Sequence, residues 1–481
     1  MAQSVKVNYI LNLINTGSQM LFPLITFPYA CRVIDADGIG QVNFFQSIIN
    51  YISIFTCLGI PMYAIREIAR VRNDIVKMNR TAIEILLLHS LLSLIGYLIV
   101  VLLCFVVPQI QADVVLFLIL SLTIFFTAIG CEWFYQCIED FKYITIRGLV
   151  IKVIALALLF IFVRSKDDIL LYGCYVVFGV LGGNIFNFFR LRKYIHKENV
   201  IFSELRIKRH IKPVLKVFSF SLVTSVYLQL NTVLLGFMKS ATAVGYFVAS
   251  TKIMQMVKGV SSSLGTVMMP RISNLVATKK NEEFKILIQK SYDFSLSISL
   301  PLTVGLIVCA PNLIKLLCGE NFENSILPSQ ILAPIIYLVA MSNIMGIQVL
   351  FPLGKVNLVT LCCGIGAIVD LLVNLVLIPR YSYIGTAVAY LCAEFATTLS
   401  MFLIARKYIP IIYIKKEHLK YVLGCSVMFL MLCFVNVWNL PIIVSLLLQG
   451  TCGMVTYFVV LFFCKENYIL SFFNRIKEWK K

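Results

Sequence analysis

The sequence predicts an all-α polytopic membrane protein with about 14 transmembrane helices, grouped as six, six and a final two. Composition is the first observation: 60% of the 481 residues are hydrophobic and only 14% are charged, a balance that excludes an ordinary soluble protein. Apolar stretches of roughly 20 residues recur along the whole chain. The lysines and arginines, finally, concentrate in alternate loops, as they do in multi-spanning membrane proteins.

Hydropathy places the spans in order along the chain. We expect them at 8–32, 38–62, 81–107, 113–136, 146–163, 169–190, 213–237, 243–269, 291–318, 329–352, 357–378, 384–406, 418–438 and 441–464. The first apolar stretch, from Tyr9 to Val33, is too long for the core of a signal peptide and contains amides. We therefore expect it to remain as an uncleaved first span.

The cationic residues predict the orientation. About 34 of the 42 lysines and arginines fall in alternate loops and tails, about six fall in the opposite loops, and only Lys252 and Lys258 lie well inside a span. The basic segments are 66–80, 137–147, 190–216, 271–290, 406–420 and the tail after Cys464. Both termini are therefore expected in the cytoplasm. The net charge of +19 then faces the anionic lipid leaflet, and no nucleic acid is expected as a partner.

The longest connection between spans is the basic segment that follows the sixth one. It divides the chain into an N-terminal lobe (1–195), a basic cytoplasmic linker (196–212), a C-terminal lobe (213–408) and a last part with two additional spans and a basic tail (409–481).

The two lobes share weak internal similarity. A shift of 205 residues places Gly245 on Gly40 and Arg271 on Arg66. A shift of 216 residues places Arg380 on Arg164. These few identities favour a duplication, which is common in transporters that rock two halves around a central site.

Polar side chains form stripes on several spans. The stripes contain Asn12, Asn15, Gln19 and Thr26 in the first span, Asn43, Gln46, Asn50 and Ser53 in the second, and Ser221, Thr224 and Asn231 in the seventh. Lipid-facing helices have little use for amides and hydroxyls, so we expect the stripes to point inward. They either line a cavity or hydrogen-bond one helix to another, and the sequence leaves both interpretations open.

The eighth span contains the two lysines that belong to neither the cytoplasmic nor the outer loops. On a helix, Lys252 and Lys258 lie about 60° to either side of Gln255 and roughly 9 Å apart along the axis. An unpaired charge at mid-depth costs at least about 2.5–3.5 kcal/mol, so both ammonium groups must face protein or water. We interpret them as an anion-binding pair. The alternative, a side chain that extends to the interface, suits Lys258 better than Lys252.

Other charged residues near the membrane have less specific interpretations. Asp370 and Glu394 lie deep in the eleventh and twelfth spans, where they either neutralise a lysine or act as coupling sites for H⁺ or Na⁺. Arg32 ends the first span on the outer side and either anchors it at the interface or faces a cavity mouth. Three further acids near cytoplasmic ends are expected to be solvated: Glu84, Glu132 and Asp293.

No catalytic arrangement is present in the sequence. It contains no paired carboxylates, nucleophile elbow or phosphate-binding glycine loop, and three of its four histidines lie in basic loops. The fifteen cysteines show no CxxC spacing and are expected to serve as small apolar residues. We therefore expect neither an enzyme nor a bound metal or other cofactor.

Several segments resemble one family of transporters. They are FPLITFPY (22–29), RVIDADGIG (32–40), REIAR (66–70), EWFYQCIEDFKYI (132–144), IFNFFRLRKYI (185–195), LGTVMMPRIS (264–273) and IQVLFPLGK (347–355). Over spans one to twelve the chain is similar to the Wzx-type flippases, the O-antigen and capsule repeat-unit transporters of the polysaccharide transporter family. Asn231 stands at a position that is often acidic in these relatives, and Cys137 stands where glycine is usual.

The resemblance implies a fold, a substrate and a location. The fold is that of the multidrug/oligosaccharidyl-lipid/polysaccharide exporters, with two six-helix lobes around a central cavity. The substrate is an undecaprenyl-pyrophosphate-linked oligosaccharide, moved from the cytoplasmic to the periplasmic leaflet of the bacterial inner membrane. Polymerase and chain-length proteins are left open as partners.

The residues and the resemblance together predict a flippase that works by alternating access. Lys252 and Lys258, with Arg32, would bind the pyrophosphate, and the amides of the first two spans would bind sugar hydroxyls. The main alternative is a multidrug exporter of the same superfamily, although a cationic drug would prefer a cavity dominated by carboxylates. A membrane glycan polymerase would need a large outer loop with catalytic groups, and the outer loops here are short.

Overall fold

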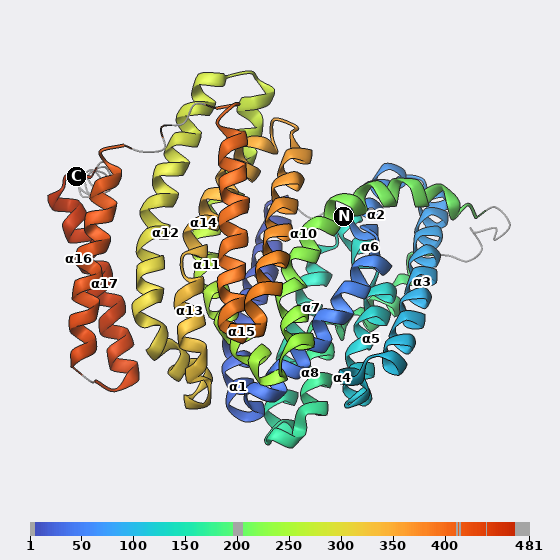
Figure 1. Cartoon of the computed structure of the whole chain (residues 1–481). Coiled ribbons are helices and arrows are strands. Elements are labelled where there is room, and N and C mark those ends of the chain that lie inside the picture. The colour runs from blue at the N-terminus through green and yellow to red at the C-terminus, as the bar shows by residue number, and fades with distance from the viewer. Residues whose placement is uncertain (1–4, 196–204, 410–411, 413–414, 439, 467–481) are drawn as a thin grey trace. The chain divides into compact units, whose positions relative to one another are not determined.

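The computed structural model describes residues 5–195, 205–409, 412, 415–438 and 440–466. Every regular element in these ranges is a helix (Figure 1), as the sequence predicts. The side chains of Asn12, Ser221 and Thr224, most of the expected linker 196–212 and the C-terminal tail from residue 467 lie outside the described residues.

The chain forms two compact units, Met1–Gly245 and Tyr246–Lys481. The first unit contains α1 (Val5–Cys57), α2 (Ile60–Val71), α3 (Ile75–Val106), α4 (Pro108–Gln111), α5 (Val114–Gly130), α6 (Glu132–Cys137), α7 (Phe141–Phe162), η1 (Lys166–Asp168), α8 (Ile169–Leu181), α9 (Gly183–Leu191) and α10 (Lys208–Met238). The predicted lobe boundaries near residues 195 and 408 stay predictions.

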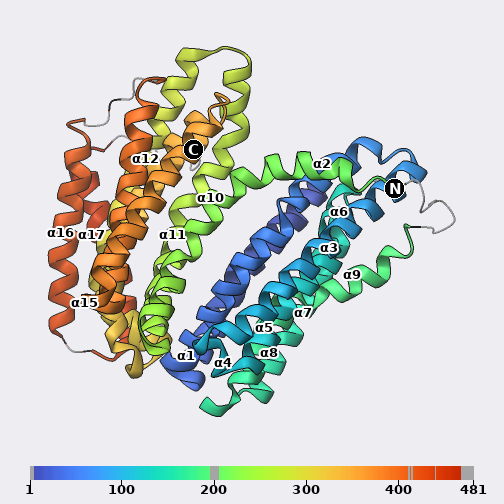
Figure 2. The same ribbon diagram turned by 45° about the vertical axis from the view of Figure 1, so that its right-hand side comes forward.

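The second unit contains most of α11 (Ala241–Ala277) and all later helices. They are α12 (Asn281–Cys318), η4 (Glu320–Ser325), α13 (Ile326–Leu332), α14 (Ile335–Asn343), η5 (Ile344–Leu350), α15 (Val356–Ala405), α16 (His418–Val437) and α17 (Ile442–Phe463). The last two helices pack against each other and against α12 (Figure 1 and Figure 2). They correspond to the two spans that the sequence adds after the second group of six.

The two longest helices of the described chain, α1 and α15, are far longer than a membrane is thick, and each is broken where the sequence predicts a loop. The 53 residues of α1 would extend about 80 Å as a straight helix, against a hydrocarbon core of about 30 Å. The break falls at Asp35, where φ is 68°. In α15 it falls at Ser382, where φ is 51°. The two arms of α15 pack against each other. Gly366 in the first arm lies so close to Thr397 in the second that a Cβ added to Gly366 would lie 1.9 Å from Thr397 Oγ1.

The outer faces of the helices suit a lipid environment. Phe105, Leu98 and Phe463 are among many large apolar side chains that are mostly exposed, which would be a severe liability in water. Eight helices of the described chain are long and apolar enough to cross a membrane, or up to ten if each of two bent pairs forms one span. The protein is therefore a multi-pass membrane protein. The number fourteen stays a prediction.

Two glycines allow very close backbone contact inside the first unit. A Cβ on Gly40 would lie 1.7 Å from the carbonyl oxygen of Ala241, and one on Gly245 would lie 1.9 Å from that of Ala36. The two contacts are equivalent in the internal repeat. A shift of 205 residues aligns Ala36 with Ala241 and Gly40 with Gly245, so each glycine contacts the alanine that precedes the other. Reciprocal contacts of this kind are what a two-fold axis produces. The geometry therefore supports the internal repeat.

A buried carboxylate ties α3 to the segment that enters α10. The Glu84 side chain is fully buried and accepts hydrogen bonds from Arg206 N and Arg209 Nη2, both at 2.7 Å. His210 Nε2 lies 2.8 Å from the same carboxylate, and His210 Nδ1 lies 2.6 Å from the hydroxyl oxygen of Tyr63. Burial lowers the pKa of His210 more than the neighbouring Glu84 raises it, so the imidazole is neutral at pH 7.

The second unit contains a similar arrangement. Asp293 of α12 accepts a hydrogen bond from Lys415 Nζ at 2.8 Å and lies 3.0 Å from His418 Nε2 at the start of α16. One turn earlier on the same helix, Gln289 Nε2 donates to Asp293 at 2.8 Å. Arg80 stands in the same relation to Glu84 in the first unit, at 3.2 Å. In each unit, therefore, an acid on one helix holds the basic connection that leads to a later helix.

The expectation that Glu84 and Asp293 are solvated is wrong. Glu84 is inaccessible to solvent, and only 14% of the Asp293 side chain is exposed. The physical reason is that the basic segments fold back over these acids and satisfy them with their own donors. Glu132, by contrast, keeps 39% of its side chain exposed while it binds Arg147.

Replacing Glu84 by alanine should destabilise the first unit strongly. The change leaves the buried His210 without its carboxylate partner and removes the acceptor of Arg206 N and of Arg209, whose side chain is 47% exposed. The expected cost is about 1–3 kcal/mol in free energy of unfolding. Denaturant unfolding of the purified protein in detergent measures this. In the matched control Glu282→Ala, the carboxylate is 80% exposed and pairs with Lys285, so the expected loss is below about 1 kcal/mol. Equal effects of the two substitutions would contradict the account.

Candidate functional site

Helix α11 carries the two lysines that the sequence singles out. It continues from Ala241 to Ala277, so Lys252 and Lys258 keep the helical spacing that places them on either side of Gln255. Both lysines are half-buried, and Gln255 is exposed. In the part of the chain that the structure describes, no hydrogen bond or ion pair reaches Lys252. Lys252 is therefore a cation without a protein counter-ion among these residues.

Lys258 has an acidic neighbour in its own unit. The buried Glu394 of α15 is close enough to interact electrostatically with Lys258. Tyr390, one turn before Glu394, interacts with both Glu394 and Asp370. The second unit thus brings Lys258 close to Glu394, and Tyr390 lies near both predicted acids of α15.

Asp370 is bound locally. Its side chain is fully buried, and Asn374 Nδ2 donates to its backbone oxygen at 2.9 Å and to its carboxylate at 3.1 Å. The amide lies one turn further along the same helix. Asn374 therefore supplies this buried acid with a neutral donor from its own helix.

The predicted amides in the second arm of α1 (Asn43, Gln46 and Asn50) bond along their own helix. Asn43 Nδ2 donates to the carbonyl oxygen of Ile39 at 2.7 Å, and Gln46 Nε2 donates to Asn50 Oδ1 at 3.0 Å. Within the described residues, Gln46 Oε1 is buried without a hydrogen-bond donor. None of these bonds joins two helices. Of the two interpretations that the sequence leaves open, they favour amides that are available to a ligand.

The other predicted residues of the first unit do not gather in one place. Asn231 of α10 is buried. Asn15 is half-buried and Gln19 is exposed in the first arm of α1, while Arg32 is exposed near its other end. The 17 residues between Asn15 and Arg32 span about 25 Å of helix. Arg32 therefore cannot share a small binding site with Asn15, and its expected role toward pyrophosphate stays a prediction.

A third lysine, Lys152, lies inside a candidate span. Lys152 lies at the middle of the 22-residue helix α7, and its Nζ donates to Ser18 Oγ of α1 at 2.7 Å. The statement that only Lys252 and Lys258 lie well inside a span is therefore wrong. Lys152 follows the basic segment 137–147 closely, so it was grouped with the cytoplasmic cations. The signal in the sequence is its position inside the expected span 146–163.

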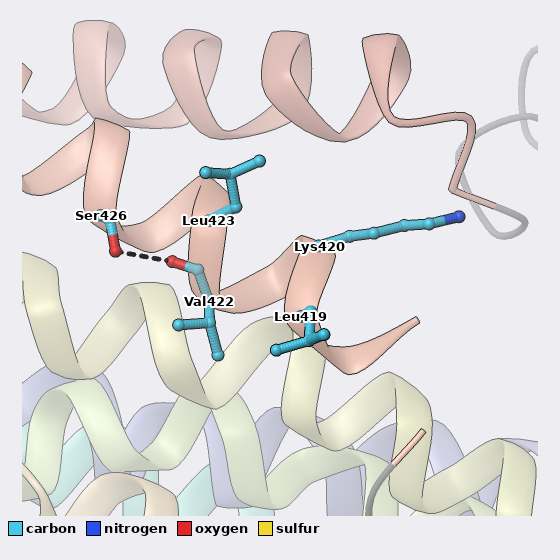
Figure 3. A pocket seen from close by; sticks show the side chains of 5 residues that line it. All are labelled: Leu419, Lys420, Val422, Leu423 and Ser426. Atoms are coloured by element: carbon cyan, nitrogen blue, oxygen red, sulfur yellow. Dashed lines mark hydrogen bonds between the residues drawn. The ribbon is translucent and has the colours of Figure 1, made fainter. Parts of the chain in front are cut away.

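Two surface hollows in the second unit have a different character. One lies on α16 and is lined by Leu419, Lys420, Val422, Leu423 and Ser426 (Figure 3). The Ser426 hydroxyl, the one hydroxyl group among the residues that line this hollow, donates to the Val422 carbonyl oxygen of the same helix at 3.0 Å. The other hollow is lined mainly by aromatic and aliphatic side chains of α12, α14 and α15. Both offer contact to apolar chains rather than to a charged headgroup.

Comparison with known proteins identifies relatives of the chain. The model of a family described as polysaccharide biosynthesis protein matches residues 5–276. A protein of Escherichia coli (strain K12) named for O-antigen transport is 25% identical over 411 residues, which cover 84% of this chain and 97% of that protein.

Solved structures share the fold at low sequence identity. The inward closed conformation of the lipid II flippase MurJ has a TM-score of 0.73 and 14% identity, over 95% of this chain and 99% of that one. A MOP superfamily transporter from Pyrococcus furiosus has a TM-score of 0.54 and 14% identity, over 83% and 94% of the two chains. The expected exporter fold is confirmed.

The proximity of Lys258 and Glu394 predicts thermodynamic coupling between them. Lys258→Met removes the cation beside a buried acid and should destabilise the protein, whereas Lys258→Met combined with Glu394→Gln should recover most of the loss. The coupling energy expected for neighbouring charges is about 0.5–3 kcal/mol. Denaturant unfolding in detergent measures it. The control cycle pairs Lys252→Met with Glu394→Gln and should be additive; additivity in both cycles would show that Lys258 and Glu394 do not pair.

Proposed function

Because the chain belongs to the polysaccharide biosynthesis protein family, we propose that it is a flippase for lipid-linked oligosaccharides that serve surface polysaccharide synthesis. The substrate we infer is an undecaprenyl-pyrophosphate-linked repeat unit, moved from the cytoplasmic to the outer leaflet. The name of the E. coli relative refers to O-antigen transport, and the fold is that of a lipid II flippase. Both agree with this substrate class.

One observation carries the proposal: the cationic centre of α11. A lysine inside a membrane span is stable only beside an anion, a polar partner or water. Lys258 has Glu394 nearby, but Lys252 has no such partner among the described residues. A pyrophosphate would supply the missing negative charge, and ammonium groups bind its oxygens well.

The same centre separates the proposal from its alternatives. A cationic drug would be repelled by Lys252, which disfavours a multidrug exporter of the same fold. The relatives are transporters rather than enzymes, which disfavours a polymerase. The protein therefore moves its substrate without changing it chemically.

The proposed cycle is alternating access. The amides Asn43, Gln46 and Asn50 would bind sugar hydroxyls, because their hydrogen bonds along α1 leave further donors and acceptors. The polyprenyl tail would stay in lipid. Asp370, which is bound by Asn374, and Glu394, which lies near Lys258, are both candidates for coupling to H⁺ or Na⁺.

The proposed location is the bacterial cytoplasmic membrane with both termini in the cytoplasm. The support is the distribution of cations in the sequence, which follows the rule for cytoplasmic loops. A polymerase and a chain-length protein are the partners we infer, because a flipped repeat unit must then be joined to others.

Lys252→Ala should abolish surface-glycan export at normal protein levels. The expected reason is the loss of the charge that binds the pyrophosphate. The measurement is surface polysaccharide, followed by gel analysis, in a strain whose own flippase has been deleted and replaced by the variant. Arg271→Ala, an exposed cation on the same helix, is the matched control and should export normally. Unchanged export by Lys252→Ala would remove this lysine from the mechanism.

A further inference from the structure

A cation at the middle of α7 has no assigned role in the proposed cycle. Lys152 stands eleven residues after the start of the helix and ten before its end, Phe141–Phe162, which is about 15 Å from either end. The helix is strongly apolar and long enough to span the membrane. At that depth an ammonium group requires a polar or anionic partner.

The protein supplies only part of what Lys152 requires. Its Nζ donates to Ser18 Oγ at 2.7 Å, and Ser18 Oγ in turn donates to the backbone oxygen of Asn15 at 2.7 Å. An ammonium group has three donors, so two remain. No carboxylate lies within ion-pair distance of Lys152 among the described residues. Glu132 interacts with it at longer range but is already bound by Arg147 at 3.0 Å.

Lys152 lies on the side of α7 that faces α1. Thr145 on the same helix donates to the backbone oxygen of Leu11 at 3.1 Å. A Cβ on Gly148 would lie 3.5 Å from Asn15 Oδ1. Positions 145, 148 and 152 share one helical face, so Lys152 points toward the polar stripe of α1 and away from lipid.

Polar groups of two kinds therefore meet at this place. The ammonium of Lys152 has free donors, and α1 presents the half-buried amide of Asn15 and the exposed amide of Gln19 next to Ser18. A cation flanked by amides and a hydroxyl can bind an oxyanion together with neighbouring hydroxyl groups.

We propose that Lys152, with Asn15 and Gln19, binds an anionic group of the transported headgroup within the first unit. This inference rests on the proposed function and adds a second cationic contact, separate from that of α11. The anionic group is an oxyanion of one of two sources: the pyrophosphate, or the carboxylate of an acidic sugar in the oligosaccharide.

The test measures binding by the purified full chain in lipid nanodiscs. Three probes are used: undecaprenyl pyrophosphate alone, the same lipid with a neutral oligosaccharide, and the same lipid with a uronic acid in the oligosaccharide. Lys152→Met should weaken binding of at least one probe about tenfold or more, and Lys152→Arg should retain most of the affinity. Lys142→Met, an exposed lysine on the same helix, is the control.

The pattern of losses identifies the source of the anion. A loss with all three probes would assign Lys152 to the pyrophosphate, and a loss with the acidic probe alone would assign it to the sugar carboxylate. Methionine at 152 removes a charge without adding bulk, so the variant should fold, and thermal unfolding checks this. Unchanged affinity of a folded Lys152→Met for every probe would overturn the inference. A wild-type protein that binds none of them would contradict the proposed function itself.

Discussion

A charged group that is removed from water, in a protein interior or in a membrane, must find a partner there. This constraint orders the whole structure. Glu84 meets it with three donors, from Arg80, Arg206 N and Arg209, and with the neighbouring His210. Asp293 meets it in a similar way. Lys258 has an acid nearby. Among the described residues Lys152 meets it only in part, and Lys252 has no hydrogen-bond or ion-pair partner. These are the positions where a ligand would contribute most.

The contacts that hold the helices together recur in the internal repeat, whereas the lysines inside the spans do not. The reciprocal glycine contacts and the two carboxylate-centred arrangements recur in both halves of the sequence, so the repeat preserves what holds the helices. The membrane lysines do not recur. Under the shift of 205 residues that the glycines obey, Lys252 corresponds to Ser47 and Lys258 to Ser53. The residues that break the repeat are therefore the best candidates for recognising an asymmetric substrate.

Hydropathy and loop chemistry predicted the helical fold and the breaks in the long helices, because both depend on local composition. The predicted loops 33–37 and 379–383 contain Asp35 and Ser382, the two residues with positive φ at which α1 and α15 break. Burial by distant segments could not be predicted in this way. Glu84 was expected to be solvated because nothing near it in sequence shows that residues 206–210 fold back over it. Lys152 lies inside the expected span 146–163 but adjoins a basic loop, and the bounds of α7 place it at the centre of the helix.

The central claim is that this protein carries an anionic, lipid-linked oligosaccharide across a membrane. Reconstitution in liposomes with a fluorescently labelled undecaprenyl-pyrophosphate oligosaccharide tests it most directly, with a membrane-impermeant quencher to report the outer leaflet. The account predicts that the wild-type protein equilibrates the label between leaflets and that Lys252→Ala, equally folded, does not. Label that stays in its starting leaflet with the folded wild-type protein, with or without a proton or sodium gradient, would contradict it.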